Sequence, residues 1–249
     1  RAGRRALRYE AVTLGHLGRW ACAACGARRP EPDVRATRVT LHGVRGTGVR
    51  IATPAGVVEA ELPLPGVHNA YNATAAVAAA LALGVPIGSV VRGLGTAEAA
   101  FGRAERVRID GRELVLLLAK NPTGANETVR TVLLDPGPLH LLVALNDRTA
   151  DGHDVSWIWD VDYEPLLPRI AALTLTGDRA YDMALRFRYA GLDPVRMRVE
   201  PDPEAALGAA LASVPAGGTL YALPTYTAML GLREILVRRG VAEAFWRER

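Results

Sequence analysis

The stretch that decides the fold is LVLLLAKNPTGANE, at residues 114–127. Its apolar run, Leu114–Ala119, is typical of a strand buried on both faces, and the Asn-Pro and Gly residues after it mark a turn into a helix. Four more apolar runs follow, separated by segments with helical periodicity: Leu139–Leu145, Ala171–Thr176, Val195–Val199 and Thr219–Leu223. Strands that alternate with helices predict an α/β fold with a parallel sheet and covering helices.

Ligands of such sheets gather at the carboxyl ends of the strands, so we expect the chemistry in the loops after Ala119, Leu145 and Leu223. Lys120, the single lysine of the chain, and Asn121 stand in the first of these loops. A lysine at a strand-to-helix turn can hold phosphate oxygens, assisted by the helix N-terminus. The same residues also fit a plain turn with a solvated lysine, and the phosphate-loop motif GxxxxGK[ST] is absent.

The second loop, NDRTADGHDVSWIWD at residues 146–160, holds four aspartates, one histidine and two tryptophans. Its spacing matches no known metal-ligand loop, including the calcium loop of EF-hands. Asp151-Gly152 fits a turn, and Asp154 fits the cap of a helix that begins at Ser156. Capping and catalysis therefore both remain open for Asp154.

The N-terminal part of the chain follows a different pattern. Three short alternating strands with glycine-rich turns are predicted at Thr37–His42, Val49–Ala52 and Val57–Leu62. The segment GVHNAYN, at residues 66–72, then leads into a helix predicted over Ala73–Leu83, which Gly84 and Pro86 end. The polar residues His68, Asn69 and Asn72 of this segment suit an anion at a helix start, and the asparagines equally suit caps.

Cys22 and Cys25 are the two cysteines of the chain and form a CxxC turn. Such a turn supplies two of the four ligands of a zinc ribbon, with His16 as a further candidate, and it also fits a redox pair or two inert thiols. No GxSxG motif occurs, so a self-contained serine or cysteine hydrolase is disfavoured. Any nucleophile would have to come from elsewhere.

Composition narrows the class of protein. With 249 residues, 49% hydrophobic and 22% charged, the chain is a globular protein of one large or two small domains. No apolar stretch reaches the ~20 residues of a membrane span. The net charge of +4 arises from interspersed basic and acidic residues, which argues against nucleic-acid binding. Because residue 1 is Arg, we expect the chain to start inside a longer polypeptide, and the two cysteines fit a reducing cytoplasm.

The segments LAKNPTG at 118–124 and LNDRTADGHDVSWIWD at 145–160 together resemble the MurT family, the Mur-ligase-like subunits of lipid II isoglutaminyl synthases that pair with the glutaminase GatD. GVHNAYN at 66–72 and Gly102-Arg103-Ala104-Glu105 add general Mur-ligase features. The resemblance implies a Mur-ligase-like α/β fold. Residues 1–104 would be the C-terminal part of the central ATPase domain, including a zinc-ribbon insertion at about 1–45. Residues 105–249 would form a Rossmann-like C-terminal domain.

The resemblance also implies an activity, the amidation of the α-carboxyl of D-glutamate in the lipid II stem peptide to D-isoglutamine. This ligase reaction uses ATP and Mg²⁺, takes ammonia from a GatD-like glutamine amidotransferase partner, and occurs at the inner face of the cytoplasmic membrane. Asp154 matches the family's aspartate that completes a Cys/His triad in the partner. Zinc at Cys22 and Cys25 would be structural. The positions implied to bind ATP or substrate are Lys120, Asn121, His68, Asn69, Asn72, Arg103 and Asn126.

Two departures from the family pattern stand out. Family members carry a CxxC shortly before the segment Leu7-Arg8-Tyr9, where this chain has no cysteine, and the family's phosphate loop is absent. Two other functions fit parts of this pattern. An amino-acid-adding ligase of the Mur or folylpolyglutamate type is disfavoured, because Leu117–Pro122 replaces the Asp-x-x-His-Asn-Pro of those enzymes. A non-catalytic Rossmann-like module that docks a partner through its acidic loop is the remaining alternative.

Overall fold

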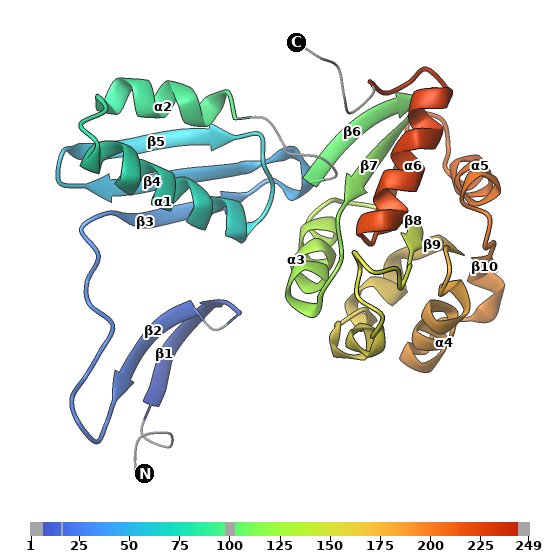
Figure 1. The fold of residues 1–249 in the computed structure, drawn as a ribbon, viewed down its shortest axis with the longest axis horizontal. Coiled ribbons are helices and arrows are strands. Elements are labelled where there is room, and N and C mark those ends of the chain that lie inside the picture. Colours follow the sequence, from blue (N-terminus) through green and yellow to red (C-terminus); the bar gives the residue numbers. More distant parts are fainter. Residues whose placement is uncertain (1–6, 16, 98–102, 244–249) are drawn as a thin grey trace. The chain divides into compact units, whose positions relative to one another are not determined.

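The computed structural model describes residues 7–15, 17–97 and 103–243. The chain forms two compact units, shown in Figure 1, and each is described by itself. One unit comprises Arg1–Leu41 with Gly46–Ala97, and the other comprises His42–Arg45 with Glu98–Arg249. No helix of the described ranges is long and apolar enough to cross a membrane.

The first unit contains a hairpin, a three-stranded sheet and two helices. The elements are β1 (Leu7–Leu14), β2 (Leu17–Cys22), β3 (Arg35–Leu41), β4 (Thr47–Thr53), β5 (Gly56–Leu62), α1 (Val67–Ala82) and α2 (Ile87–Gly95). Strands β3, β4 and β5 pair in that order, all antiparallel, which confirms the three predicted strands. The predicted helix begins earlier than expected, at Val67, so the polar segment 66–72 forms its first turns rather than a loop before it. The core of this unit is built around Ile51, Val58 and Val77.

The second unit is built on a six-stranded sheet with the order β10-β9-β8-β11-β7-β6. Its strands are β6 (Arg103–Ile109), β7 (Arg112–Leu117), β8 (Leu139–Ala144), β9 (Ile170–Thr176), β10 (Met197–Val199) and β11 (Thr219–Pro224). The five predicted strands are confirmed and pair in parallel. An unpredicted edge strand, β6, joins them antiparallel to β7 through a turn in which Asp110 and Gly111 both have positive φ.

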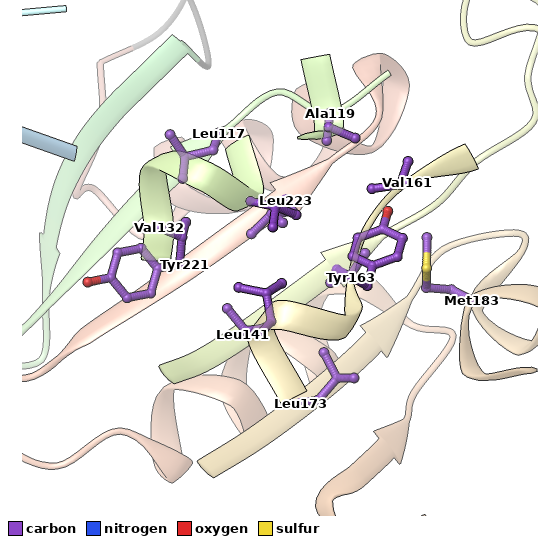
Figure 2. Close-up of a cluster of buried hydrophobic side chains, with 14 of the residues drawn as sticks. Leu117, Ala119, Val132, Leu141, Val161, Tyr163, Leu173, Met183, Tyr221 and Leu223 are labelled. Carbon is purple, nitrogen blue, oxygen red and sulfur yellow. The ribbon is translucent and has the colours of Figure 1, made fainter. Parts of the chain in front are cut away.

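Helices cover both faces of this sheet, as the predicted α/β class requires. The covering elements are α3 (Pro122–Leu133), the 3₁₀ helices η3 (Ser156–Asp160) and η4 (Glu164–Arg169), α4 (Ala180–Ala190), α5 (Pro203–Ser213) and α6 (Tyr226–Arg238). Side chains alternate along each strand, so Val115 and Leu117 pack with α3, while Leu114 and Leu116 pack towards α5 and α6. Figure 2 shows the first of these two cores, which also receives residues of η3, η4 and α4.

The segments that follow the strands change from one face of the sheet to the other beside β11. Strands β7, β8 and β9 are each followed by a segment on the α3 and α4 face, whereas β11 is followed by α6 on the opposite face. Since β11 lies between β8 and β7, the chain leaves neighbouring strands in opposite directions at their carboxyl ends. Ligands of open α/β sheets bind at such a switch point.

Candidate functional site

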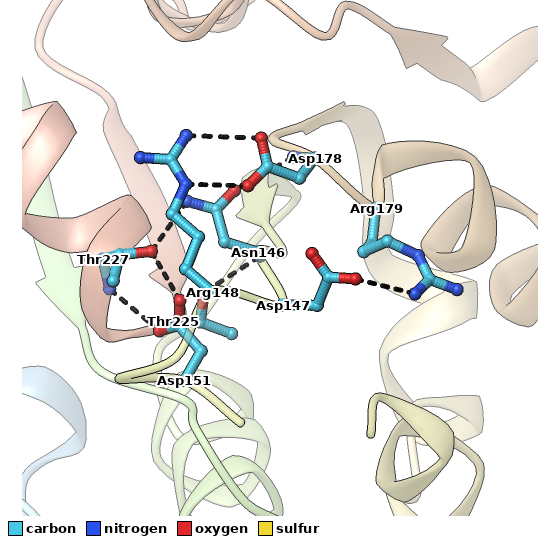
Figure 3. A network of polar contacts seen from close by, with 8 residues as sticks. All are labelled: Asn146, Asp147, Arg148, Asp151, Asp178, Arg179, Thr225 and Thr227. Carbon is cyan, nitrogen blue, oxygen red and sulfur yellow. Dashed lines mark hydrogen bonds and ion pairs between the residues drawn. The ribbon is translucent and has the colours of Figure 1, made fainter. Parts of the chain in front are cut away.

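Asn146 lies at the centre of the polar residues at this switch point (Figure 3). It follows β8, is buried, and its backbone N–H donates to Thr225 Oγ1 at 3.0 Å. Its side-chain Nδ2 donates to Thr227 Oγ1 at 2.9 Å, and its Oδ1 accepts from the N–H of Asp178 at 3.0 Å. One asparagine therefore joins the carboxyl ends of β8, β9 and β11.

Asp151 extends this network to the start of α6. Its carboxylate accepts the backbone N–H of Thr227 at 2.9 Å and also the Thr227 hydroxyl. The predicted turn is present as well, because the N–H groups of Asp151 and Gly152 donate to the Arg148 carbonyl at 2.8 and 3.0 Å. Asp151 thus fastens the acidic loop to helix α6, in addition to shaping its turn.

Two ion-pair groups lie beside the network. Arg148 binds both oxygens of Asp178, at 2.8 and 3.3 Å. Arg179 reaches Asp182 at 2.7 Å and Asp147 at 2.9 Å, and its hydrogen bond lowers the pKa of Asp182. These partners are partly exposed, so their attraction is screened by water and they position the loops more than they stabilise the fold.

Gly177 makes the close approach of the β8 and β9 loops possible. Its φ is +93°, and a Cβ there would lie 2.5 Å from Asn146 Oδ1 and 2.7 Å from the Leu145 carbonyl oxygen. Gly177, Asp178, Thr225 and Thr227 of this site are not among the residues predicted from the sequence. The signal that could have found them is their position, directly after the apolar runs of β9 and β11.

Asp154 lies exposed in the same acidic loop. Its Oδ1 accepts the backbone N–H of Ser156 at 2.8 Å, where η3 begins, and hydrogen bonds from Ser156 lower the pKa of the Asp154 carboxyl. The predicted helix start at Ser156 is confirmed, although the helix is a short 3₁₀ helix. Within the described ranges no cation pairs with Asp154, so the site offers an ionised carboxylate of fixed position, open to solvent.

The loop after β7 and the first turns of α3 hold three of the residues predicted to bind ATP or substrate. Lys120 is exposed, and no described residue pairs with it. Asn121 caps α3, because its Oδ1 accepts the N–H of Gly124 at 2.8 Å. Asn126 donates to the Asp160 carbonyl at 3.2 Å and accepts from the Asp162 N–H at 2.8 Å. Both asparagines thus have structural roles, and Asn126 holds the end of the loop that carries Asp154.

The other predicted binding residues belong to helix α1 and strand β6. Asn69 is buried and donates to the Pro65 carbonyl at 2.8 Å, and its Oδ1 accepts from Asn72 at 3.3 Å. His68 Nε2 lies 3.2 Å from Asn69 Nδ2. These three side chains form one polar cluster in the first turns of α1. Arg103 begins β6, and its side chain lies outside the described residues.

The CxxC segment forms a tight turn after β2. The Gly26 N–H donates to the Cys22 carbonyl at 3.0 Å, the Cys22 N–H donates to Ala27, and a side-chain hydrogen bond with Cys25 lowers the pKa of Cys22. Among residues 7–15, 17–97 and 103–243, no three His, Cys, Asp or Glu side chains gather as metal ligands, and His16 lies outside these ranges. A tetrahedral zinc site has four ligands, and the two thiols supply two of them. The described residues therefore do not complete the zinc site predicted at Cys22 and Cys25.

Comparisons with known proteins agree with this architecture. Residues 118–229 match the family model of the MurT ligase C-terminal domain. The chain is 36% identical, over 94% of its length, to the protein from Streptococcus pneumoniae named lipid II isoglutaminyl synthase (glutamine-hydrolyzing) subunit MurT, and covers 52% of that protein. It is 28% identical to the Staphylococcus aureus (strain COL) protein of the same name, over 94% of this chain and 51% of that protein. The chain therefore spans about half the length of the curated relatives it matches.

Solved structures with this fold include several peptide ligases. A pseudomurein peptide ligase type C from Methanothermus fervidus superposes with a TM-score of 0.70 at 22% identity, over 94% of this chain and 47% of that one. MurF from Acinetobacter baumannii superposes with a TM-score of 0.65 at 26% identity, over 81% of this chain and 45% of that one. The fold is that of the Mur ligases, and residues 118–229 of the chain are similar to the MurT ligase C-terminal domain.

Proposed function

We propose that this chain is part of the synthase subunit of a lipid II isoglutaminyl synthase. The subunit amidates the α-carboxyl of D-glutamate in the lipid II stem peptide, with ammonia released from glutamine by a GatD-like glutaminase. Similarity to MurT subunits over 94% of the chain supports this proposal. Under this proposal, residues 1–104 are the C-terminal part of the central ATPase domain, and residues 105–249 form the C-terminal domain. Because the substrate is lipid-linked, the reaction takes place at the inner face of the cytoplasmic membrane.

The reaction requires activation, because a carboxylate is a poor electrophile. ATP supplies the phosphoryl group that turns the carboxylate into a better one. The residues present fit an assisting role towards phosphate oxygens: Lys120 is an exposed cation beside the N-terminus of α3. They do not make a nucleotide site by themselves, since the chain has no GxxxxGK[ST] motif and its described part has no cluster of ligands for Mg²⁺.

The proposed roles of the two subunits rest on the exposure and the hydrogen bonding of the Asp154 carboxylate. Its carboxylate is exposed and held by the Ser156 N–H, without a cation from the described part of the chain. The chain's cysteines lie in the CxxC segment, far along the sequence from this loop. In this proposal Asp154 orients the catalytic histidine of the glutaminase, where a carboxylate fixes the imidazole tautomer and stabilises the imidazolium.

The test is amidation of lipid II by the full natural subunit together with its glutaminase, driven by glutamine or by ammonium. Asp154→Asn keeps the shape and removes the charge, so glutamine-driven amidation is expected to fall by up to about 10⁴-fold. Ammonium-driven amidation is expected to persist. Asp160→Asn changes another exposed aspartate, at the end of the 3₁₀ helix that follows Asp154; it is the matched control and is expected to keep both activities. Loss of both activities in Asp154→Asn would contradict the proposed role.

A further inference from the structure

The excess of positive charge in the chain is concentrated in one segment. Residues 1–35 hold eight of the 30 basic residues and three of the 26 acidic residues. This segment therefore carries a net charge of +5, whereas residues 36–249 carry −1. Although basic and acidic residues are interspersed along the whole chain, the net charge of +4 thus belongs to the segment that contains the hairpin of β1 and β2 (Figure 1).

One face of this hairpin is apolar and exposed. Tyr9 pairs with Trp20, and Val12 pairs with Gly18, two residues before Trp20. Paired residues, and residues two apart on one strand, point to the same side of a sheet. Four side chains therefore share one face, which we call the hairpin face: Leu7, Tyr9, Val12 and Trp20. Leu7, Tyr9 and Val12 are 50%, 47% and 61% exposed.

The opposite face of the hairpin packs within the first unit. Ala11 and Arg19, which pair with each other, line a cavity together with Tyr71 of α1. The hydroxyls of Thr13 and Tyr71 are hydrogen-bonded to each other. These contacts use the other side of the hairpin, so the hairpin face remains open to solvent.

Arginines border the hairpin face. Arg8 stands between Leu7 and Tyr9 on β1, and Arg28 lies just after the turn that follows β2. Both are exposed, and neither pairs with a carboxylate of the described residues. The Arg19 side chain is 66% exposed even though it lies 3.3 Å from a glutamate of β1. An arginine can lay its aliphatic stem along an apolar surface while its guanidinium reaches a neighbouring anion.

This combination of side chains is typical of a surface that binds an anionic membrane. Tyrosine and tryptophan rings favour the level of the lipid headgroups, and each arginine near that level is attracted by the anionic phosphates. Nucleic acid also attracts arginine. However, the exposed Leu7 and Val12 gain nothing from phosphates, whereas in a membrane they are removed from water. The apolar residues therefore favour a lipid surface.

We propose that the hairpin face docks the subunit on the anionic phospholipid of the membrane that holds its substrate. This inference rests on the proposed function, in which the substrate is lipid-linked. A few apolar side chains and arginines give weak, reversible membrane binding. Such binding suits an enzyme that moves from one lipid-linked substrate molecule to the next, because it keeps the subunit near the membrane without fixing it there.

The test measures binding of the full natural subunit, in complex with its glutaminase, to vesicles by co-sedimentation. We expect vesicles of equal parts phosphatidylglycerol and phosphatidylcholine to bind wild type about 10-fold or more tightly than phosphatidylcholine alone, and high salt to reduce this difference. Leu7→Ser/Val12→Ser removes apolar contacts, and Arg8→Gln/Arg28→Gln removes two charges. Each double variant is expected to bind anionic vesicles about 10- to 30-fold more weakly.

Two double variants outside the hairpin are the matched controls. Leu83→Ser/Leu134→Ser changes leucines that are 83% and 50% exposed, and Arg92→Gln/Arg198→Gln removes two exposed cations of α2 and β10. Both are expected to bind anionic vesicles like wild type. Equal losses in the controls and in the hairpin variants would indicate attraction by the charge of the whole molecule and overturn the proposal. Unfolding temperatures near that of wild type verify that the variants are folded.

The possible failures are distinguishable, because vesicle binding needs neither ATP nor substrate. If wild type does not prefer anionic vesicles, the docking surface is wrong, while amidation of lipid II in detergent would still support the proposed function. If the hairpin variants lose vesicle binding but the wild-type complex amidates no lipid II, the docking surface stands and the proposed function fails. If the hairpin variants lose binding to single-stranded RNA while vesicle binding is unchanged, the hairpin face belongs to nucleic acid and the proposal is overturned.

Discussion

A single hydroxyl, that of Thr227, joins two loops of the candidate site. It accepts from Asn146 Nδ2 and donates to the Asp151 carboxylate. Thr227→Val keeps the shape and leaves both partners without this contact, so we expect the free energy of unfolding to fall by about 1–3 kcal/mol. Urea denaturation measures the change. Thr123→Val, which alters an exposed threonine of α3, is the control, and a similar loss in both variants would contradict this role.

Lys120 has the opposite character, because its side chain is exposed and unpaired within the described ranges. Lys120→Ala is therefore expected to change the free energy of unfolding by no more than about 0.5 kcal/mol. Under the proposed function it should abolish amidation driven by glutamine and by ammonium alike, because both routes need the activated carboxylate. Amidation by the complete complex at saturating ammonium measures this. Normal activity there would remove Lys120 from the reaction.

The sequence could identify loops at this scale, but not the pairs formed between them. Lys120 stands out from composition, as the single lysine of the chain, whereas a catalytic role for Asp154 follows only from the family resemblance. The partners of Asn146 are 32 and more residues away, at Asp178 and Thr227, and no pattern in one sequence shows that such residues meet. Asn126 has a polar side chain in the first turns of α3, close in sequence to Lys120, yet its hydrogen bonds go to the backbone of residues 160 and 162.

Among the secondary-structure elements, the loop between β9 and α4 depends on Gly177. Gly177→Ala would combine a positive φ with overlap against Asn146 Oδ1 and the Leu145 carbonyl. Gly191, the C-cap of α4, has a similar φ of +101° but open space around its Cβ position. We expect Gly191→Ala to cost about 1–2 kcal/mol from backbone strain and Gly177→Ala about 1–3 kcal/mol more from overpacking. Thermal or urea unfolding measures both losses. If the two variants lost the same free energy of unfolding, the loops after β8 and β9 would be able to move apart at no energetic cost.

The predicted elements differ in how well their local pattern specifies them. Four of the five parallel strands, β7, β8, β9 and β11, are mostly buried, so their continuous apolar runs are visible in the sequence, whereas the edge strand β10 is short and partly exposed. Strand β6, RAERVRI, alternates charged and apolar residues at the sheet edge and has no continuous apolar run, and the boundary expected between residues 104 and 105 falls within it. Helix α1 begins before the predicted start, and its polar first turns are tied together by the hydrogen bond from Asn72 to Asn69, while Asn69 also donates to the Pro65 carbonyl just before the helix.

At the scale of the whole molecule, the described residues form three clusters of buried side chains, two on the faces of the large sheet and one in the first unit. Two tyrosines of the large sheet's first core, Tyr163 and Tyr221, are buried. Desolvation raises the pKa of both phenols well above 10, and for Tyr221 the carboxylate of Asp135, which accepts its hydroxyl at 3.0 Å, adds to the rise. Both groups therefore stay protonated in the folded chain where an unfolded chain ionises.

This difference predicts how the molecule loses stability in alkali. Above pH 10 the unfolded state releases tyrosine protons that the folded state keeps, so each such tyrosine lowers the free energy of unfolding by about 1.4 kcal/mol per pH unit. Below pH 10 its contribution is constant. Tyr163→Phe removes one of these groups and should reduce the slope between pH 10 and 12 by about that amount, as measured by urea unfolding at a series of pH values. Tyr181→Phe changes an exposed tyrosine of α4 and should leave the slope as in wild type. An unchanged slope in Tyr163→Phe would mean that the core around η4 and α4 opens to water before the rest of the molecule unfolds.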